Sequence, residues 1–361
     1  MMCKPMRFAS TILFLLMVAA PPSGAVDLSP LARALDKNGD LRVSGEELSP
    51  PAERTLLAAL DANGDGALDT EELLTIGRGG AGRGRRSRRG PANWDYAEET
   101  AEGMRIFRNI EYATGPEYAG GRGKLDVVVP EGEGPFPVIV FFHGGGLNNG
   151  DKYSLSRLGP RFARLGYLVV TPNYRLSPEF YYPAYVEDGA RAFKWSWDHV
   201  ADYGGDRDAL VVSGGSAGGH VAALLTTDES FLLAQGMSFA NVRASLPITA
   251  LMDATRAGSD RVLVSWAGDL ELAKRASPIR HVRAELPPML ITVADGDTED
   301  RRRQNQEMFE ALEEAGHSAV EFAWLVDRTH GSILPHMLEE GDATVELLLA
   351  FMRKHGVPGR P

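Results

Sequence analysis

A serine inside a run of glycines constrains the fold of this chain most. Ser216 lies in the segment GGSAGG of residues 214–219, between the apolar run ALVVS of residues 209–213 and the helix-like run GHVAALLTT. A residue between such a strand and helix must occupy a tight turn, and the glycines remove the side-chain clashes of that turn. We therefore expect the serine hydroxyl to project from the carboxyl end of a sheet, beside a helix N-terminus whose free N–H groups favour developing negative charge.

A second glycine-rich turn, HGGG at residues 143–146, follows another apolar run, PVIVFF. Consecutive glycines let backbone N–H groups face an incoming carbonyl, and each donor aimed at a tetrahedral oxyanion contributes about 3–4 kcal/mol. We expect the N–H groups of Gly145, Gly146 and Ala217 to form such an oxyanion hole. We expect His143 to brace the turn by hydrogen bonds rather than to act as a base.

Three motifs together resemble those of the α/β-hydrolase esterase/lipase family: the HGGG turn, YRLSPE at residues 174–179, and the GGSAGG turn. The chain is most similar to the hormone-sensitive-lipase-like and BD-FAE-like (bifunctional feruloyl and acetyl-xylan) esterases, over about residues 104–356. This resemblance implies an α/β-hydrolase fold and a serine nucleophile that works with an acid and a histidine. Leu147 stands where an aromatic residue often follows the glycines, and Ser177 replaces the usual alanine of YRLAPE, so the resemblance leaves the preferred substrate open.

The resemblance places the acid on the loop after the apolar run PMLITVA of residues 288–294. In this family the triad follows the chain order serine, acid, histidine. Asp297 matches the position of the family's acid best, and Asp295 and Asp300 are the alternatives. An ordinary solvated acidic turn is the other interpretation of this loop.

The resemblance places the base after the next apolar run, EFAWLV, where His330 precedes a glycine. His336 is the alternative base. In these roles Ser216 is the nucleophile and His330 takes its proton. Asp297 then fixes the imidazole tautomer and stabilises the imidazolium.

The N-terminal part contains two twelve-residue acidic loops with a separate chemistry. Each has oxygen ligands at positions 1, 3 and 5, an apolar residue at position 8 and Glu at position 12, which is the pattern of an EF-hand calcium loop. The expected Ca²⁺ ligands of the first loop are Asp36, Asn38, Asp40, the carbonyl of Arg42, Ser44 through water, and Glu47. Those of the second loop are Asp61, Asn63, Asp65, the carbonyl of Ala67, Asp69 and Glu72.

The two loops are not equivalent, and they lie close together. Leu41 replaces the glycine at position 6 of the first loop, and a non-glycine residue with positive φ is strained, so we expect this loop to bind Ca²⁺ more weakly. The loops begin 25 residues apart, and Pro50-Pro51 interrupts the segment between them. This spacing favours one short joining helix and a small structural calcium module. It resembles the short EF-hand pairs appended to secreted bacterial proteins.

The first residues predict export from the cytoplasm. Two basic residues precede the apolar run of residues 8–20, and Ser23 and Ala25 stand at positions −3 and −1 of a cleavage site. The run is too short to span a bilayer, and no later segment is long and apolar enough. We therefore expect residues 1–25 to be a cleaved signal peptide, with an uncleaved anchor as the alternative, and a secreted or periplasmic protein. The only cysteine, Cys3, would leave with this segment.

Charge and composition predict three parts after the signal peptide. Residues 26–76, the expected EF-hand pair, hold 11 acidic and four basic residues. Residues 77–93 hold six arginines and no acidic residue, and without apolar periodicity they are expected to be a flexible Gly/Arg-rich linker. The linker lacks aromatic residues and the chain has a net charge of −11, so we expect no nucleic-acid partner. Apolar runs alternate with helical patterns over residues 94–361, which predicts a mostly parallel sheet covered by helices on both faces, preceded by the small α-helical calcium module.

These features together predict a secreted serine carboxylic-ester hydrolase that needs no cofactor for catalysis. No long lid precedes the first strand, and residues 253–285 could form only a small cap, in which Trp266 is either a pocket wall or a core residue. An open site suits a small-molecule or polysaccharide ester with a short acyl group, such as an acetylated carbohydrate or an aryl ester. The alternatives are a serine peptidase or amidase on the same fold, and a non-catalytic calcium-dependent binding protein.

Overall fold

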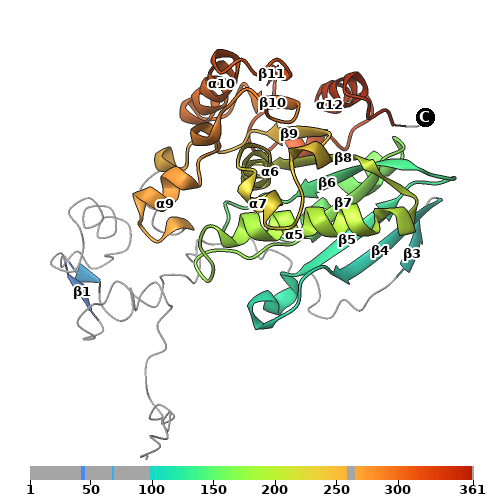
Figure 1. The fold of residues 1–361 in the computed structure, drawn as a ribbon, viewed down its shortest axis with the longest axis horizontal. Helices are drawn as coiled ribbons and strands as arrows, with labels where there is room; N and C mark the ends of the chain where they lie inside the picture. The colour runs from blue at the N-terminus through green and yellow to red at the C-terminus, as the bar shows by residue number, and fades with distance from the viewer. Residues whose placement is uncertain (1–41, 45–66, 69–97, 102, 258–264, 360–361) are drawn as a thin grey trace, which may run out of the picture.

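The structure is a computed structural model, and it describes residues 42–44, 67–68, 98–101, 103–257 and 265–359. Within these residues one sheet has nine strands in the spatial order β11-β10-β9-β8-β6-β7-β5-β4-β3 (Figure 1). Its strands are β3 (Glu98–Ala101), β4 (Met104–Glu111), β5 (Lys124–Val129), β6 (Phe136–Phe142), β7 (Leu168–Pro172), β8 (Gly205–Gly215), β9 (Ala244–Ile248), β10 (Met289–Ala294) and β11 (Val320–Leu325).

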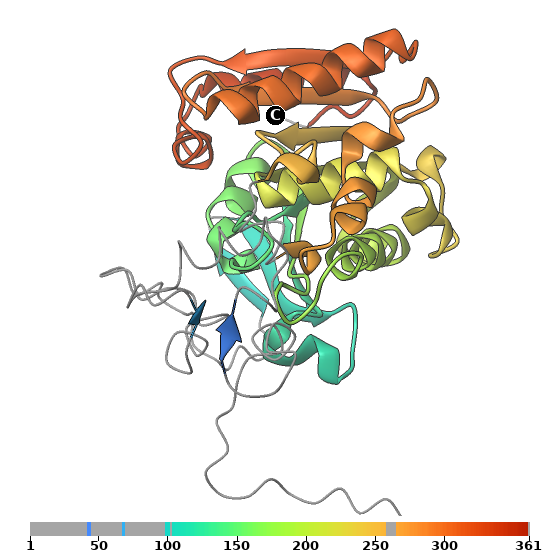
Figure 2. The same cartoon turned by 90° about the vertical axis from the view of Figure 1, so that its left-hand side faces the viewer.

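The helices lie on both faces of this sheet (Figures 1 and 2). The α-helices are α4 (Leu158–Ala163), α5 (Ala184–His199), α6 (Ala217–Thr227), α7 (Ser230–Leu233), α9 (Leu270–Arg275), α10 (Glu299–Glu314), α11 (Ile333–His336) and α12 (Ala343–Lys354). The 3-10 helices are η1 (Pro116–Gly121), η2 (Lys152–Leu155), η3 (Val200–Tyr203), η4 (Phe239–Asn241), η5 (Ala254–Arg256) and η6 (Pro278–His281). No helix in these described ranges is both long and apolar enough to cross a membrane.

The sheet is parallel where it carries the predicted motifs. Strands β6 to β11 pair in parallel, whereas β3, β4 and β5 form an antiparallel edge that joins β7. The carboxyl ends of parallel strands meet at one edge of a sheet, and the crevice outside that edge is where open α/β sheets bind ligands. The loops after β6, β8, β10 and β11 therefore converge, although their residues are far apart in the sequence.

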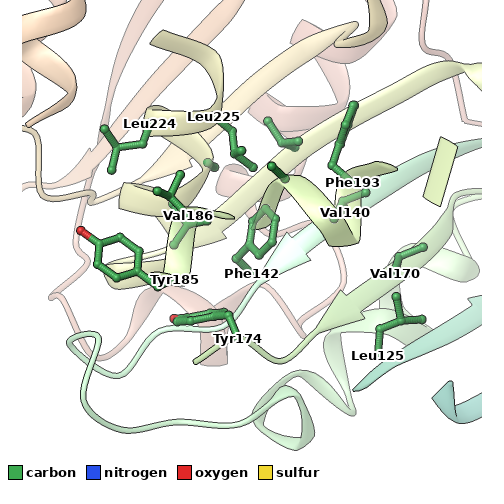
Figure 3. Packing of buried hydrophobic residues seen from close by; sticks show 14 of the residues in the cluster. Leu125, Val140, Phe142, Val170, Tyr174, Tyr185, Val186, Phe193, Leu224 and Leu225 are labelled. Carbon is green, nitrogen blue, oxygen red and sulfur yellow. The ribbon is translucent and has the colours of Figure 1, made fainter. Parts of the chain in front are cut away.

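Alternating side chains of the central strands build two cores, one on each face. On β6, Val140 and Phe142 join the core that contains α5 and α6, while Ile139 and Phe141 join the core that contains α4 and α12. Figure 3 shows the first of these cores, with Val140 and Phe142 beside the side chains of Val186 and other residues of α5. A strand buried on both faces needs a continuous apolar run, which is the pattern of FPVIVFF. The predicted mostly parallel sheet with helices on both faces is confirmed for the described part of the chain.

Only short pieces of the predicted calcium loops belong to the described residues. Strand β1 (Val43–Ser44) pairs antiparallel with β2 (Ala67–Leu68), with Val43 opposite Leu68 and Ser44 opposite Ala67. Among the predicted ligands, Arg42, Ser44 and Ala67 therefore lie in or beside this pair. The other predicted Ca²⁺ ligands, the predicted signal peptide and the Gly/Arg-rich linker lie outside the described residues.

Candidate active site

Ser216 occupies the sharp turn between β8 and α6. Its backbone angles are φ 56° and ψ −115°, which are strained for a residue other than glycine. Its N–H donates to the carbonyl of Ile248 at 2.9 Å, which fixes the turn against β9. A Cβ atom at Gly218 would lie 2.0 Å from the carbonyl oxygen of Phe142, so only glycine allows α6 to begin this close to β6. The turn thus places the serine hydroxyl at the carboxyl edge of the sheet, as expected from the sequence.

The structure brings Ser216, His330 and Asp297 together in one hydrogen-bonded chain. His330 Nε2 lies 2.9 Å from Ser216 Oγ, and His330 Nδ1 lies 2.7 Å from Asp297 Oδ2. A carboxylate can only accept, so Nδ1 carries the proton and Nε2 is left to accept from the serine hydroxyl. This arrangement can transfer the serine proton to the imidazole.

Asp297 is a buried carboxylate with several donors around it. Its side chain is 3% exposed, whereas that of His330 is 40% exposed. Asp297 also accepts from the hydroxyl of Thr249 and, at 2.7 Å, from the backbone N–H of Thr298. Burial raises the pKa of the Asp297 carboxyl, but the hydrogen bonds from His330 and Thr249 outweigh it, and the net pKa lies below its ordinary value. The carboxylate therefore stays ionised at neutral pH beside the imidazole.

The alternative acids and the alternative base have other partners. Asp295 accepts hydrogen bonds from the backbone N–H groups of Asp327 and Arg328, both at 3.1 Å. Asp300 is paired with Arg256 through its carboxylate. His336 Nδ1–H donates to the carbonyl of Ser332 within its own helix turn, at 2.6 Å. Among the acids and bases considered from the sequence, the geometry next to Ser216 thus favours Asp297 and His330.

The three residues predicted for the oxyanion hole line one cavity with Ser216. Gly145, Gly146 and Ala217 all border it. Gly145 has φ 124°, and a Cβ atom there would lie 2.1 Å from the carbonyl oxygen of Asn149. The HGGG turn and the serine turn thus face the same space, from which backbone donors can reach a substrate carbonyl.

His143 is buried behind the glycine turn, away from the hydrogen-bonded chain. Its Nδ1–H donates to the carbonyl of Gly144 at 2.7 Å, and its ring stacks on Tyr174 with centroids 4.3 Å apart. The hydroxyl of Tyr174 in turn donates to the carbonyl of His143 at 2.6 Å. Burial lowers the pKa of His143 to about 4, so the ring is neutral at physiological pH. These contacts agree with a bracing role for His143.

The cavity has a volume of about 470 Å³ and a largely apolar wall. Its apolar lining comes from Leu147, Ile248, Leu251, Ile333 and Leu334, among others. Trp266, which the sequence leaves as either a wall or a core residue, is fully buried and packs in the core. Within the predicted cap region, residues 258–264 lie outside the described ranges.

Sequence reasoning missed three residues that shape this site, namely Thr249, His220 and Arg301. His220 lines the cavity one helical turn after Ser216, and that i+4 spacing is the signal that could have revealed it. Its Nδ1–H donates to the carbonyl of Leu251 at 2.8 Å, and its Nε2 accepts from the hydroxyl of Tyr185 at 3.0 Å. Burial lowers the pKa of His220 to about 4, so this ring is a neutral part of the wall.

Comparison with known proteins identifies the family of this chain. Residues 125–312 match the sequence model of the BD-FAE family. The chain belongs to the BD-FAE family. Membership confirms the resemblance that the HGGG, YRLSPE and GGSAGG motifs carry.

Curated relatives come from Mycobacterium tuberculosis, among other organisms. Esterase LipQ is 32% identical over 209 residues, which cover 54% of this chain and 50% of the relative. Carboxylic ester hydrolase LipN is 32% identical over 252 residues, which cover 63% of this chain and 65% of the relative. The chain thus spans about half to two thirds of the length of these relatives.

Solved structures show the same fold at low sequence identity. Esterase B from Lactobacillus rhamnosis superposes with a TM-score of 0.62 at 19% identity, over 71% of this chain and 90% of that chain. Propionate-bound Est2 from the Planctomycetes species Thermogutta terrifontis superposes with a TM-score of 0.57 at 24% identity, over 72% of this chain and 97% of that chain. These likenesses confirm the predicted α/β-hydrolase fold.

Proposed function

We propose that this protein hydrolyses carboxylic esters through an acyl-enzyme formed on Ser216. The observation that carries the proposal is the hydrogen-bonded chain from Ser216 through His330 to Asp297, which opens on a cavity lined by backbone donors. The names of the relatives LipQ, an esterase, and LipN, a carboxylic ester hydrolase, agree with this activity.

Each residue has a definite task in the proposed reaction. Ser216 Oγ attacks the ester carbonyl carbon while His330 Nε2 takes the hydroxyl proton. The carbonyl oxygen becomes an oxyanion that faces the N–H groups of Gly145, Gly146 and Ala217. The imidazolium then protonates the departing alcohol, and the same histidine activates the water that hydrolyses the acyl-enzyme. The ionised Asp297 stabilises the imidazolium in both halves of the reaction.

We further propose short acyl esters, such as acetylated carbohydrates or aryl esters, as the substrates. A cavity of about 470 Å³ lies at the small end of the range for ligand pockets. Two of the solved structures with this fold are described as a carbohydrate esterase from gut microbiota and as Est2 with propionate bound. The bound propionate agrees with a small acyl group, and the carbohydrate esterase agrees with a carbohydrate as the alcohol.

Replacement of the nucleophile tests the proposed function. Ser216→Ala should lower turnover of 4-nitrophenyl acetate by about 10⁴-fold or more, because the three residues act as a unit. It should also abolish covalent labelling by a fluorophosphonate. Ser230→Ala, which removes the hydroxyl of an exposed serine on α7, is the control and should leave both readouts unchanged. Near-normal turnover in folded Ser216→Ala would overturn the mechanism, and faster cleavage of an aminoacyl anilide than of the ester would favour a peptidase or amidase.

The proposal also includes a calcium-binding module at residues 26–76 and a cleaved signal peptide at residues 1–25. The antiparallel pairing of Val43 with Leu68 agrees with the calcium module, because it joins the eighth position of one predicted loop to the eighth position of the other. Ca²⁺ bound by such oxygen ligands would be structural, with no part in the chemistry at Ser216. Export is tested by expression of the full chain in a bacterium with fractionation, where a mature protein that starts at Val26 in the periplasm or medium is expected.

A further inference from the structure

Arg301 gives the cavity a positive charge. Of the described residues that line this cavity, Arg301 is the only one with a permanently charged side chain. The surrounding wall is apolar, apart from the glycine turns, Thr249, the reactive serine and histidine, and the neutral ring of His220. In such surroundings an ion interacts more strongly with its partners than it would in water.

Arg301 is held in place by the first turn of α10. Its N–H donates to the hydroxyl of Thr298 at 3.3 Å, and its carbonyl accepts from the side chain of Asn305 at 2.9 Å. The same Asn305 amide donates to the carbonyl of Ala250 at 2.9 Å, in the segment that also carries Thr249 and Leu251 into the cavity wall. The backbone of Arg301 is thus fixed by the first turn of α10, and Asn305 joins that helix to the segment around Ala250.

This placement of an arginine is unfavourable for the fold on two counts. The first turn of a helix favours acidic residues, because the helix dipole is positive at that end. Burial of part of a guanidinium beside apolar side chains also removes water from a charged group. A residue that violates local preferences at the edge of a candidate active site is often kept for binding or catalysis.

Two carboxylates shortly before Arg301 in the sequence, both among the described residues, bind other groups. Asp297 accepts from His330 and Thr249, and Asp300 is paired with Arg256. A guanidinium has five N–H donors in a planar fork, so it can hold a group of the protein along one edge and still present donors to a ligand. A carboxylate matches that fork with two parallel hydrogen bonds.

We propose that Arg301 forms an anion subsite, and that the enzyme prefers esters that carry a carboxylate group close to the scissile bond. The inference rests on the proposed ester hydrolysis at Ser216 and names the class of ester within it. The carboxylate can belong to the acyl part of the ester or to its alcohol part. Both present the same chemistry to Arg301, and the two arms of the experiment below separate them.

The test compares each anionic ester with its neutral amide counterpart. In the acyl arm, mono-4-nitrophenyl adipate is compared with the matching adipamate ester. In the alcohol arm, 4-acetoxybenzoate is compared with 4-acetoxybenzamide. The measured quantity is the ratio of kcat/KM for the anionic ester to kcat/KM for the neutral ester. We expect Arg301→Gln to lower this ratio by about tenfold or more in one arm, and Arg301→Lys to lower it less.

Arg303→Gln is the matched control, because it removes the same charge from the same helix. Arg303 is exposed and pairs with Asp300 and Glu307 at the surface, so this change should leave both ratios unchanged. A second measurement, competitive inhibition of the unmodified enzyme, needs no variant. In it, 4-hydroxybenzoate or adipate should inhibit more strongly than the corresponding amide. Equal losses on anionic and neutral esters in Arg301→Gln, or unchanged ratios in both arms, would overturn the subsite. Activity that survives Ser216→Ala would instead overturn the proposed function, whatever Arg301 does.

Discussion

The carboxylate of Asp295 accepts a hydrogen bond from the backbone N–H of Arg328 at 3.1 Å, and so joins the loop of Asp297 to the loop of His330. A second bond, from the N–H of Asp327, has the same length, and the carbonyl of Arg328 accepts from the N–H of Gly296 at 2.9 Å. The two bonds that the Asp295 carboxylate accepts lower its pKa, the bond from Asp327 most, so the group is ionised at neutral pH. Asp295, which the sequence offers as a rival acid, thus contacts the loop that carries His330 rather than His330 itself.

The first prediction follows from this connection between the two loops. Asp295→Ala should lower kcat by about 10- to 100-fold, because misplacement of a catalytic group by about 1 Å has effects of this size. Asp297→Asn should lower it by about 10⁴-fold, because the wrong imidazole tautomer is then stabilised. KM for a small ester should change little in Asp295→Ala, since Asp295 does not line the cavity. Steady-state kinetics on 4-nitrophenyl acetate measures both values, and a larger loss in Asp295→Ala than in Asp297→Asn would reverse the two roles.

The second prediction concerns Leu147, which lies in the cavity wall with a strained φ of 66°. Leu147→Ala should widen the cavity and raise kcat/KM for 4-nitrophenyl hexanoate relative to the acetate by several-fold, since each methylene in an apolar pocket is worth about 1–3 kcal/mol. Loss of the buried side chain should also lower the free energy of unfolding by about 2–5 kcal/mol. Leu155→Ala removes an equally buried leucine outside the cavity, and it should reduce stability without a change in chain-length preference.

The strands and the reactive serine could be predicted from the sequence because their signals are local, whereas Asp297 and His330 were assigned from the family resemblance. Continuous apolar runs such as that of β6 indicate strands buried on both faces. The structure has the expected strand before each of Ser216, Asp297 and His330. The order of neighbours in the sheet could not be predicted, since no local pattern shows that β6 lies between β7 and β8.

The remaining features of the site depend on contacts between distant segments. Thr249 reaches Asp297 across 48 residues of sequence, and Asn305 joins α10, which carries Arg301, to the carbonyl of Ala250 beside the cavity. A threonine after a strand and an arginine among four charged neighbours carry no sequence signal for these roles. The place of Trp266 could not be predicted either, because a large aromatic side chain suits both a core and a pocket wall.

The third prediction concerns the loss of stability in acid. Burial lowers the pKa of His220 to about 4, whereas an unfolded histidine titrates near about 6.5. Between these values the unfolded chain binds a proton that the folded chain does not, so stability falls as pH falls from about 6.5 towards 4, by at most about 1.4 kcal/mol per pH unit. His220→Asn keeps a donor for the carbonyl of Leu251 and should reduce this slope in urea unfolding at pH 7, 6 and 5. His199→Asn removes an exposed histidine and should leave the slope unchanged.

The last prediction concerns Ca²⁺, which we expect to stabilise residues 26–76 by binding their folded state. Without the ion, the carboxylates of each predicted loop repel one another and disfavour the compact form, so EGTA should make this segment more sensitive to protease. Glu72→Gln should weaken Ca²⁺ binding measured by calorimetry more than Glu47→Gln, because Leu41 already weakens the first loop. The predicted linker of residues 77–93 has no large apolar side chain that could pack and transmit the change, so kcat on 4-nitrophenyl acetate should be nearly equal in EGTA and in millimolar Ca²⁺. A several-fold difference in kcat would show that the calcium module shapes the active site, and it would contradict the independence predicted for the two parts.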